Sequence, residues 1–265
     1  MYRERSYLMR WLNVIAFLAM VTVNALAVLL PINGITPGQV SDAYPTLFAP
    51  AALTFSIWSV IYLLLLLFTL YQTGALTRRT PEQLDAAQRI GPLFALSALF
   101  NIAWIFSWHY DQILLSLCCM LGLLATLILI YTRVGKTALS LREKLMARLP
   151  FSVYFGWITV ATIANVSTAL VSLGWNRFGL SESLWTIAIL IVGMAIGLAV
   201  VIPQRDMFYG LTMTWAYAGI VIKHGSALGW HYAYPAVLWT AAAAGAILLA
   251  ASIISTIQSA KAEAM

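Results

Sequence analysis

Residues 50–71 of the chain read PAALTFSIWSVIYLLLLLFTLY. A helix needs roughly 20 apolar residues to cross the hydrocarbon of a bilayer, and this stretch supplies them. A single strand in lipid would leave its peptide groups without hydrogen-bond partners, so the stretch must be helical. We therefore predict a membrane-spanning helix over Ala51–Tyr71, with Trp58 and Tyr62 on one of its faces.

The rest of the chain has the same character. Of its 265 residues, 62% are hydrophobic and only 9% are charged, and the mean hydropathy is +0.88. A water-soluble domain cannot bury so much apolar surface, so lipid must be the solvent for most of it. Hydropathy predicts about eight spans. They are Trp11–Leu30, Ala51–Tyr71, Pro92–Trp108, Ile113–Tyr131, Pro150–Val171, Leu184–Ile202, Phe208–Ile222 and Ala233–Ile257. The fold class predicted is all-α, a polytopic membrane helix bundle.

Basic residues predict the orientation of the bundle. Of the 15 Lys and Arg residues, all but Arg177 and Lys223 fall at the termini or in alternate loops on one side. This asymmetry indicates an even number of spans with both termini in the cytoplasm. It also accounts for the net charge of +6 through contact with anionic lipid headgroups, without nucleic acid as a partner. We expect a bacterial inner (plasma) membrane.

Aromatic and amide residues recur deep inside the predicted spans, where lipid alone would ask only for apolar side chains. Asn24 lies in the middle of the first span. Such amides either join helix to helix or line a cavity, and aromatic walls with a few polar groups are typical of ligand pockets. We predict that seven of these residues bind a ligand. They are Trp58, Tyr62, Asn101, Trp104, Tyr154, Trp157 and Asn165.

Catalytic and metal sites have less support. No Ser/His/Asp set, paired carboxylates or phosphate loop stands out, so we predict no catalytic residue and leave enzymatic activity open. His109, His224 and His231 all fall on the predicted outer side near Asp111 and could together bind a metal or haem iron. Their spacing does not favour this, and we predict no metal site.

Three motifs carry a resemblance to a known family. Pro50 is followed by Trp58-Ser59-Val60-Ile61-Tyr62, the third span has Asn101-Ile102-Ala103-Trp104, and the fifth has Tyr154-Phe155-Gly156-Trp157 with Asn165 eight residues later. In this order, after a long Pro-rich first loop, the motifs resemble the TspO/MBR family. These are the tryptophan-rich sensory proteins related to the peripheral benzodiazepine receptor. The resemblance covers about the first 175 residues.

The resemblance implies a five-helix transmembrane unit over residues 1–175, and the remaining residues 176–265 would form a three-helix extension. It also implies an integral membrane receptor or binding protein for a flat, mostly apolar ligand such as a porphyrin or sterol. No cofactor is required, although bound porphyrin or haem is expected among the ligands. A second copy of the chain, forming a homodimer, is a candidate partner. The alternatives are a transporter or channel for an uncharged solute and a tetrapyrrole-degrading membrane enzyme.

Overall fold

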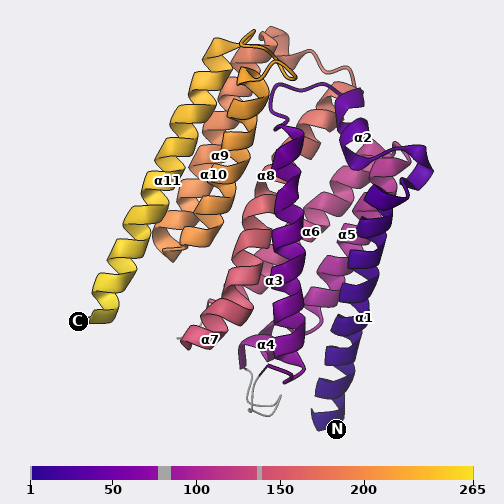
Figure 1. The fold of residues 1–265 in the computed structure, drawn as a ribbon, viewed down its shortest axis with the longest axis vertical. Coiled ribbons are helices and arrows are strands. Elements are labelled where there is room, and N and C mark those ends of the chain that lie inside the picture. The colour runs from indigo at the N-terminus through magenta and orange to yellow at the C-terminus, as the bar shows by residue number, and fades with distance from the viewer. Residues whose placement is uncertain (1, 77–84, 136–138, 265) are drawn as a thin grey trace. The chain divides into compact units, whose positions relative to one another are not determined.

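The computed structural model describes residues 2–76, 85–135 and 139–264 (Figure 1). Most of the described residues are helical, and they include no strand. The all-α prediction is confirmed. Arg78, Arg79 and Lys136, which contributed to the predicted orientation, lie outside the described residues.

Each predicted span corresponds to a long helix among the described residues. The helices are α1 (Tyr2–Leu29), α3 (Ile57–Gln72), α5 (Leu93–His109), α6 (Ile113–Val134), α8 (Leu149–Ser172), α9 (Glu182–Gln204), α10 (Met207–Gly225) and α11 (Pro235–Ala264). Shorter helices are α2 (Pro37–Ala43), α4 (Asp85–Ile90) and α7 (Leu141–Glu143), and a 3-10 helix, η2 (Ala52–Ser56), precedes α3. The second span therefore begins with a tighter turn than predicted, and the regular α-helix starts at Ile57.

Length and apolar composition support a polytopic membrane protein. Within the described residues, six helical segments are long and apolar enough to cross a bilayer, and Leu93–His109 is apolar but shorter. The six segments are Leu8–Gly34, Ala52–Gln72, Ile113–Val134, Leu141–Ser172, Glu182–Gln204 and Pro235–Gln258.

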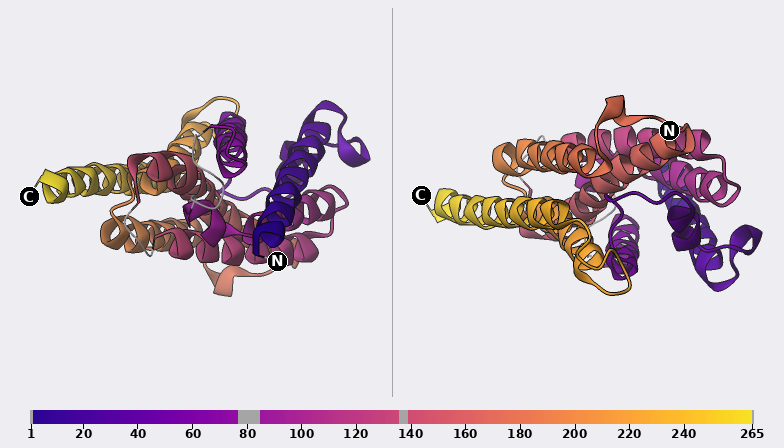
Figure 2. Two further views of the ribbon diagram at one scale, coloured as in Figure 1. Left: turned by 90° about the horizontal axis from the view of Figure 1, so that it is seen from below. Right: turned by 90° about the horizontal axis from the view of Figure 1, so that it is seen from above.

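The chain divides into two compact units. The first contains residues 1–40 and 58–155, and the second contains residues 41–57 and 156–265. Within the first unit, α5 packs against α1 and α6. Within the second unit, α11 packs against α9 and α10, and the views in Figure 2 show these three helices as neighbours. The predicted separation of a family-like part from an extension near residue 175 is a different division and stays a prediction.

Phenylalanine rings fill the core of the first unit. The Phe68 ring lies 5.0 Å from Phe151 and 5.3 Å from Phe94, edge to face in both pairs, and Phe17 stacks on Phe94 at 6.5 Å. Edge-to-face contacts add about 0.5–1.5 kcal/mol to the burial of such rings. Helices α1, α3, α5 and α8 are thus held together by one aromatic cluster.

Asn13 of α1 caps a different helix. Its Oδ1 accepts a hydrogen bond from the backbone N–H of Ala95 at 3.2 Å, in the first turn of α5. Its Nδ2 donates to Gln72 Oε1 at 2.9 Å and to the Gly91 carbonyl at 3.0 Å. The first N–H groups of a helix have no partner within the helix, and Pro92 at the start of α5 provides no side-chain cap. Asn13 therefore supplies the cap from another helix.

Two glycines of the second unit lie at close contacts between its segments. A Cβ atom at Gly193 would collide with the Tyr217 hydroxyl, and one at Gly219 would collide with the Thr54 side chain. The Tyr217 hydroxyl donates to the Leu190 carbonyl at 2.7 Å, and the Tyr209 hydroxyl donates to Thr159 Oγ1 at 3.0 Å. Small residues let these helices approach, and the two phenols then find partners across them.

We predict that Asn13→Leu lowers the free energy of unfolding by about 1–3 kcal/mol, because it removes the cap of α5 and leaves buried polar groups unpaired. Reversible unfolding in mixed micelles followed by circular dichroism measures the effect. Ile15→Ala is the control, since the Ile15 side chain on the same helix is 63% exposed. Equal stability of the two variants would contradict the capping role.

Candidate ligand site

Three buried polar side chains form a hydrogen-bonded series across the first unit. Asn24 of α1 donates through Nδ2 to Asn101 Oδ1 of α5 at 2.7 Å, and to its own helix at the Met20 carbonyl at 2.9 Å. Asn101 donates through its Nδ2 to the Tyr154 hydroxyl oxygen of α8 at 3.2 Å. Asn101 and Tyr154 are fully buried, and Asn24 is 8% exposed. The series joins three helices and satisfies groups that hydrocarbon would leave unpaired.

Aromatic rings continue this series at Tyr154. The Trp58 ring meets the Tyr154 ring edge to face at 5.9 Å, and Tyr62 stacks on Trp58 at 5.5 Å with the planes 20° apart. Trp58 and Tyr62 lie one turn apart on α3, which is why their rings can stack. Both are half-buried, whereas Tyr154 behind them is fully buried. We call Trp58, Tyr62, Asn101 and Tyr154 the α3–α8 cluster.

Trp104 lies one turn after Asn101 on α5 and has an aromatic neighbour on the same helix. Its ring stacks on Trp108 at 5.8 Å, and the Trp108 Nε1–H donates to the Pro37 carbonyl at 3.0 Å. The pair therefore connects α5 with the first residue of α2. Trp104 is half-buried, and Trp108 is 6% exposed.

Trp157 and Asn165 belong to the second unit, although they lie on the same helix as Tyr154. Trp157 meets Phe55 edge to face at 5.7 Å. Both predicted residues are buried, at 3% exposure each. The structure thus brings together Trp58, Tyr62, Asn101 and Tyr154 within the first unit, and Trp157 and Asn165 are assigned to the second.

Two residues join the predicted set. Asn24 is the hydrogen-bond donor to Asn101, and its position in the middle of a predicted span was the signal for it. Trp108 stacks on Trp104, and the i, i+4 spacing of the two tryptophans was the available signal. Neither had been included among the seven predicted ligand-binding residues.

The α3–α8 cluster consists of uncharged groups. It offers ring faces for stacking and hydrogen-bonding groups that are already oriented by their neighbours. Such an arrangement suits binding of a flat ligand with few polar atoms.

The three histidines are divided between the two units. His109 belongs to the first unit, and its Nδ1 donates to the Ile105 carbonyl at 2.7 Å. His224 and His231 belong to the second, where His224 Nε2 donates to the Leu47 carbonyl at 2.9 Å. Burial lowers the pKa of His224, and the hydrogen bond to Leu47 offsets part of this effect. Among the described residues, no group of three or more His, Cys, Asp or Glu could hold a metal ion.

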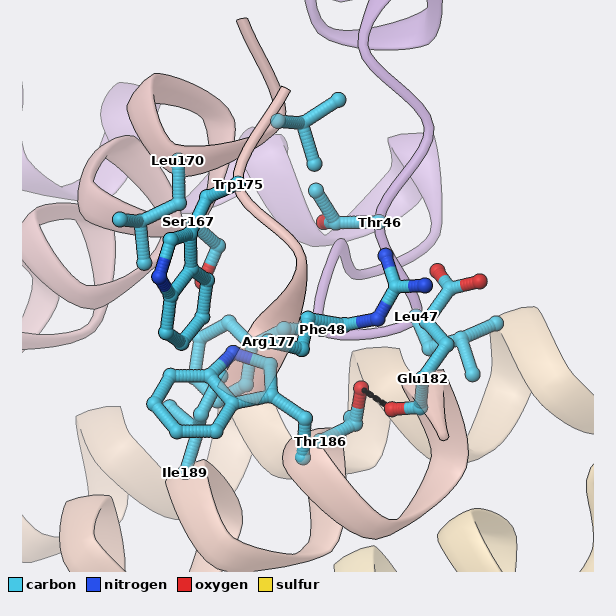
Figure 3. Close-up of a pocket in the computed structure, with 12 residues that line it drawn as sticks. Thr46, Leu47, Phe48, Ser167, Leu170, Trp175, Arg177, Glu182, Thr186 and Ile189 are labelled. Atoms are coloured by element: carbon cyan, nitrogen blue, oxygen red, sulfur yellow. Dashed lines mark hydrogen bonds between the residues drawn. The ribbon is translucent and has the colours of Figure 1, made fainter. Parts of the chain in front are cut away.

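The second unit contains a small aromatic cavity that was not predicted (Figure 3). Trp175 and Trp185 meet at 4.7 Å with a 72° angle, and Thr186 donates to the Glu182 carbonyl at 2.8 Å. Arg177 and Glu182 line the same cavity. Its volume of about 30 Å³ has room for about one water molecule, so it is too small for a flat organic ligand.

These features define a polytopic helical membrane protein. Its helices are apolar and of spanning length, buried polar groups such as Asn24 and Asn101 are paired with each other, and half-buried rings lie beside those groups. The family model described as TSPO-like protein matches residues 10–254. The chain belongs to this family, which confirms the resemblance noted from its motifs. The match runs beyond residue 175 and includes most of the expected extension, so the resemblance covers more of the chain than the motifs alone indicated. No curated protein and no solved structure matches the chain.

A double-mutant cycle tests the hydrogen bond between Asn24 and Asn101. We expect the effects of Asn24→Ala and Asn101→Ala on unfolding free energy to be non-additive by about 1 kcal/mol, the usual size of such a bond in a membrane protein. The control cycle pairs Asn24→Ala with Asn13→Ala, eleven residues away on α1. Additivity within about 0.5 kcal/mol is expected there. Additive effects in both cycles would show that the two amides are not coupled.

Proposed function

We propose that the protein is a membrane receptor or binding protein for a flat, mostly apolar ligand of the porphyrin or sterol type. The observation that supports this most strongly is the α3–α8 cluster. Two half-buried rings, Trp58 and Tyr62, lie against a fully buried Tyr154 whose oxygen is held by Asn101. Membership of the TSPO-like family supports the proposal independently.

The groups of the cluster have separate roles in this proposal. Trp58 and Tyr62 provide ring surface for the plane of the ligand, and aromatic contacts of this type contribute about 0.5–1.5 kcal/mol each beyond burial. The Tyr154 oxygen accepts from Asn101, so the Tyr154 ring forms a fixed support behind Trp58. Asn101 holds the phenol in position. Trp104, one turn after Asn101 on α5, is a further candidate contact for the ligand. The roles predicted for Trp157 and Asn165 stay predictions.

Preorganisation is the reason for preferring binding to a purely structural role. Asn24, Asn101 and Tyr154 already satisfy one another's hydrogen bonds. The packing of the helices therefore does not require the rings of Trp58 and Tyr62 on α3 to remain half-exposed. A ligand that covers these rings gains apolar contact without breaking a buried hydrogen bond. Its binding therefore carries little reorganisation cost.

Titration with protoporphyrin IX, followed by tryptophan fluorescence of the purified protein in nanodiscs, tests the proposal. We expect saturable quenching, with affinity about tenfold weaker in Trp58→Leu because one ring contact is lost. Tyr154→Phe should weaken binding by a smaller factor, because it removes only the hydroxyl. Trp239→Leu is the control, since Trp239 on α11 is 70% exposed and belongs to the other unit.

Three outcomes separate the proposed function from its alternatives. Non-saturable quenching, or equal affinity in all variants, contradicts the binding site. Flux of an uncharged solute into liposomes without such binding indicates a transporter or channel. Conversion of bound protoporphyrin IX to a product indicates a tetrapyrrole-degrading enzyme, provided that Trp58→Leu abolishes the conversion.

A further inference from the structure

A tightly built turn follows α10 in the second unit. The Trp230 N–H donates to the Lys223 carbonyl at 2.9 Å, and the Tyr232 N–H donates to the His224 carbonyl at 2.8 Å. A Cβ atom at Gly229 would collide with the Lys223 carbonyl, so this position requires glycine. His231 and Tyr232 both adopt positive φ angles, of 46° and 59°. Two consecutive non-glycine residues in this region are costly, and such strain is concentrated at functional sites.

The turn is fastened to the segment over residues 41–49 of the same unit. His224 is fully buried and donates from Nε2 to the Leu47 carbonyl at 2.9 Å. Its ring lies 6.1 Å from Tyr234 and 6.3 Å from Trp230, and the latter two rings meet edge to face at 5.4 Å. This aromatic group fixes the position of Trp230 and of the adjacent Lys223 backbone.

A cavity of about 180 Å³ lies between the turn and this segment. It resembles in size an engineered protein cavity of about 150 Å³ that binds benzene. Its wall combines charged side chains with hydroxyl and apolar groups. The wall includes Asp42, Lys223, Ser41, Thr46, Pro45 and Trp230.

Opposite charges face each other loosely on this wall. Lys223 Nζ and the Asp42 carboxylate are 3.8 Å apart, beyond the 2.7–2.9 Å of a direct charge-assisted hydrogen bond. The two side chains are 27% and 76% exposed. An exposed ion pair of this type contributes between zero and about 1 kcal/mol to the stability of the fold. A ligand can therefore replace it at little cost.

The surroundings of the cavity are typical of the boundary between lipid and water. Lys223 directly follows the predicted apolar span Phe208–Ile222, and a lysine at a helix end extends its ammonium group toward water. Trp230, Tyr232 and Tyr234 come within the next eleven residues, and Trp and Tyr are enriched at the level of the headgroups. A ligand at this depth can therefore carry charge.

We propose that this cavity binds a small zwitterionic group, with its phosphate or carboxylate against Lys223 and its ammonium against Asp42. A ligand that is only anionic would meet the repulsion of Asp42, and one that is only cationic would meet that of Lys223. Zwitterionic phospholipid headgroups and free zwitterions share the required chemistry. The site shares no residue with the α3–α8 cluster and does not depend on the function proposed for that cluster.

Native mass spectrometry of the full-length protein, equilibrated with phosphatidylethanolamine or phosphatidylglycerol, tests the site. We expect the wild type to retain phosphatidylethanolamine, and Lys223→Met and Asp42→Asn each to retain about fivefold less, because each removes one of two charge contacts. Asp42→Asn should retain as much phosphatidylglycerol as the wild type or more, since it removes a repulsion from an anionic ligand. Arg205→Met, which removes a basic residue at the end of α9, is the control and should leave retention of phosphatidylethanolamine unchanged.

A second set of measurements separates the two sources of the ligand. Displacement of the lipid by free O-phosphoethanolamine would show that the zwitterionic group alone is sufficient, whereas its failure to displace would assign the site to a whole lipid. Lys223→Arg, which keeps the charge, should retain phosphatidylethanolamine. Thermal unfolding verifies that each variant is folded, and Lys223→Gln replaces Lys223→Met if the latter is not. Equal retention of phosphatidylethanolamine by wild type and both charge variants, or loss of both lipids in Asp42→Asn, would overturn the proposal.

Discussion

Hydrocarbon offers no hydrogen bonds, and this constraint organises the protein more than any other. A buried amide or phenol in a membrane helix must find its partner within the protein. Asn13 meets this need by capping α5, and Asn24, Asn101 and Tyr154 meet it by bonding to one another. Because each of these bonds joins different helices, satisfying the polar groups also fixes how α1, α5 and α8 pack.

The same constraint shapes the candidate site. Once Asn101 and Tyr154 are paired, their positions are fixed, and the rings of Trp58 and Tyr62 rest against a rigid support. The second unit follows the same rule with different residues. Tyr209 and Tyr217 bond across helices there, and His224 holds the segment over residues 41–49 through a backbone carbonyl. In both units, hydrogen bonds between buried polar groups hold the helices together, and aromatic rings lie beside these groups.

Hydropathy alone predicted the positions of the long helices, because a spanning segment is a property of local composition. Three motifs within those helices were enough to indicate the family. The side chains with which the polar and aromatic residues form hydrogen bonds and ring contacts could not be predicted, since such contacts depend on the packing of distant segments. Nothing local to Asn13 indicates that it caps a helix beginning eighty residues later. The stacking of Trp104 on Trp108, and the attachment of the turn after α10 to Leu47, likewise required the folded chain.

The contact between the two amides at the centre of the first unit is the most direct test of this account. Solid-state NMR of the protein in lipid bilayers, with asparagine side chains labelled with nitrogen-15 and carbon-13, can detect it. The account predicts a through-space correlation between Asn24 Nδ2 and the Asn101 side-chain carbonyl, together with slow exchange of these amide hydrogens with deuterium. Absence of the correlation, or rapid exchange of both amides, would show that the polar groups are solvated separately and would contradict it.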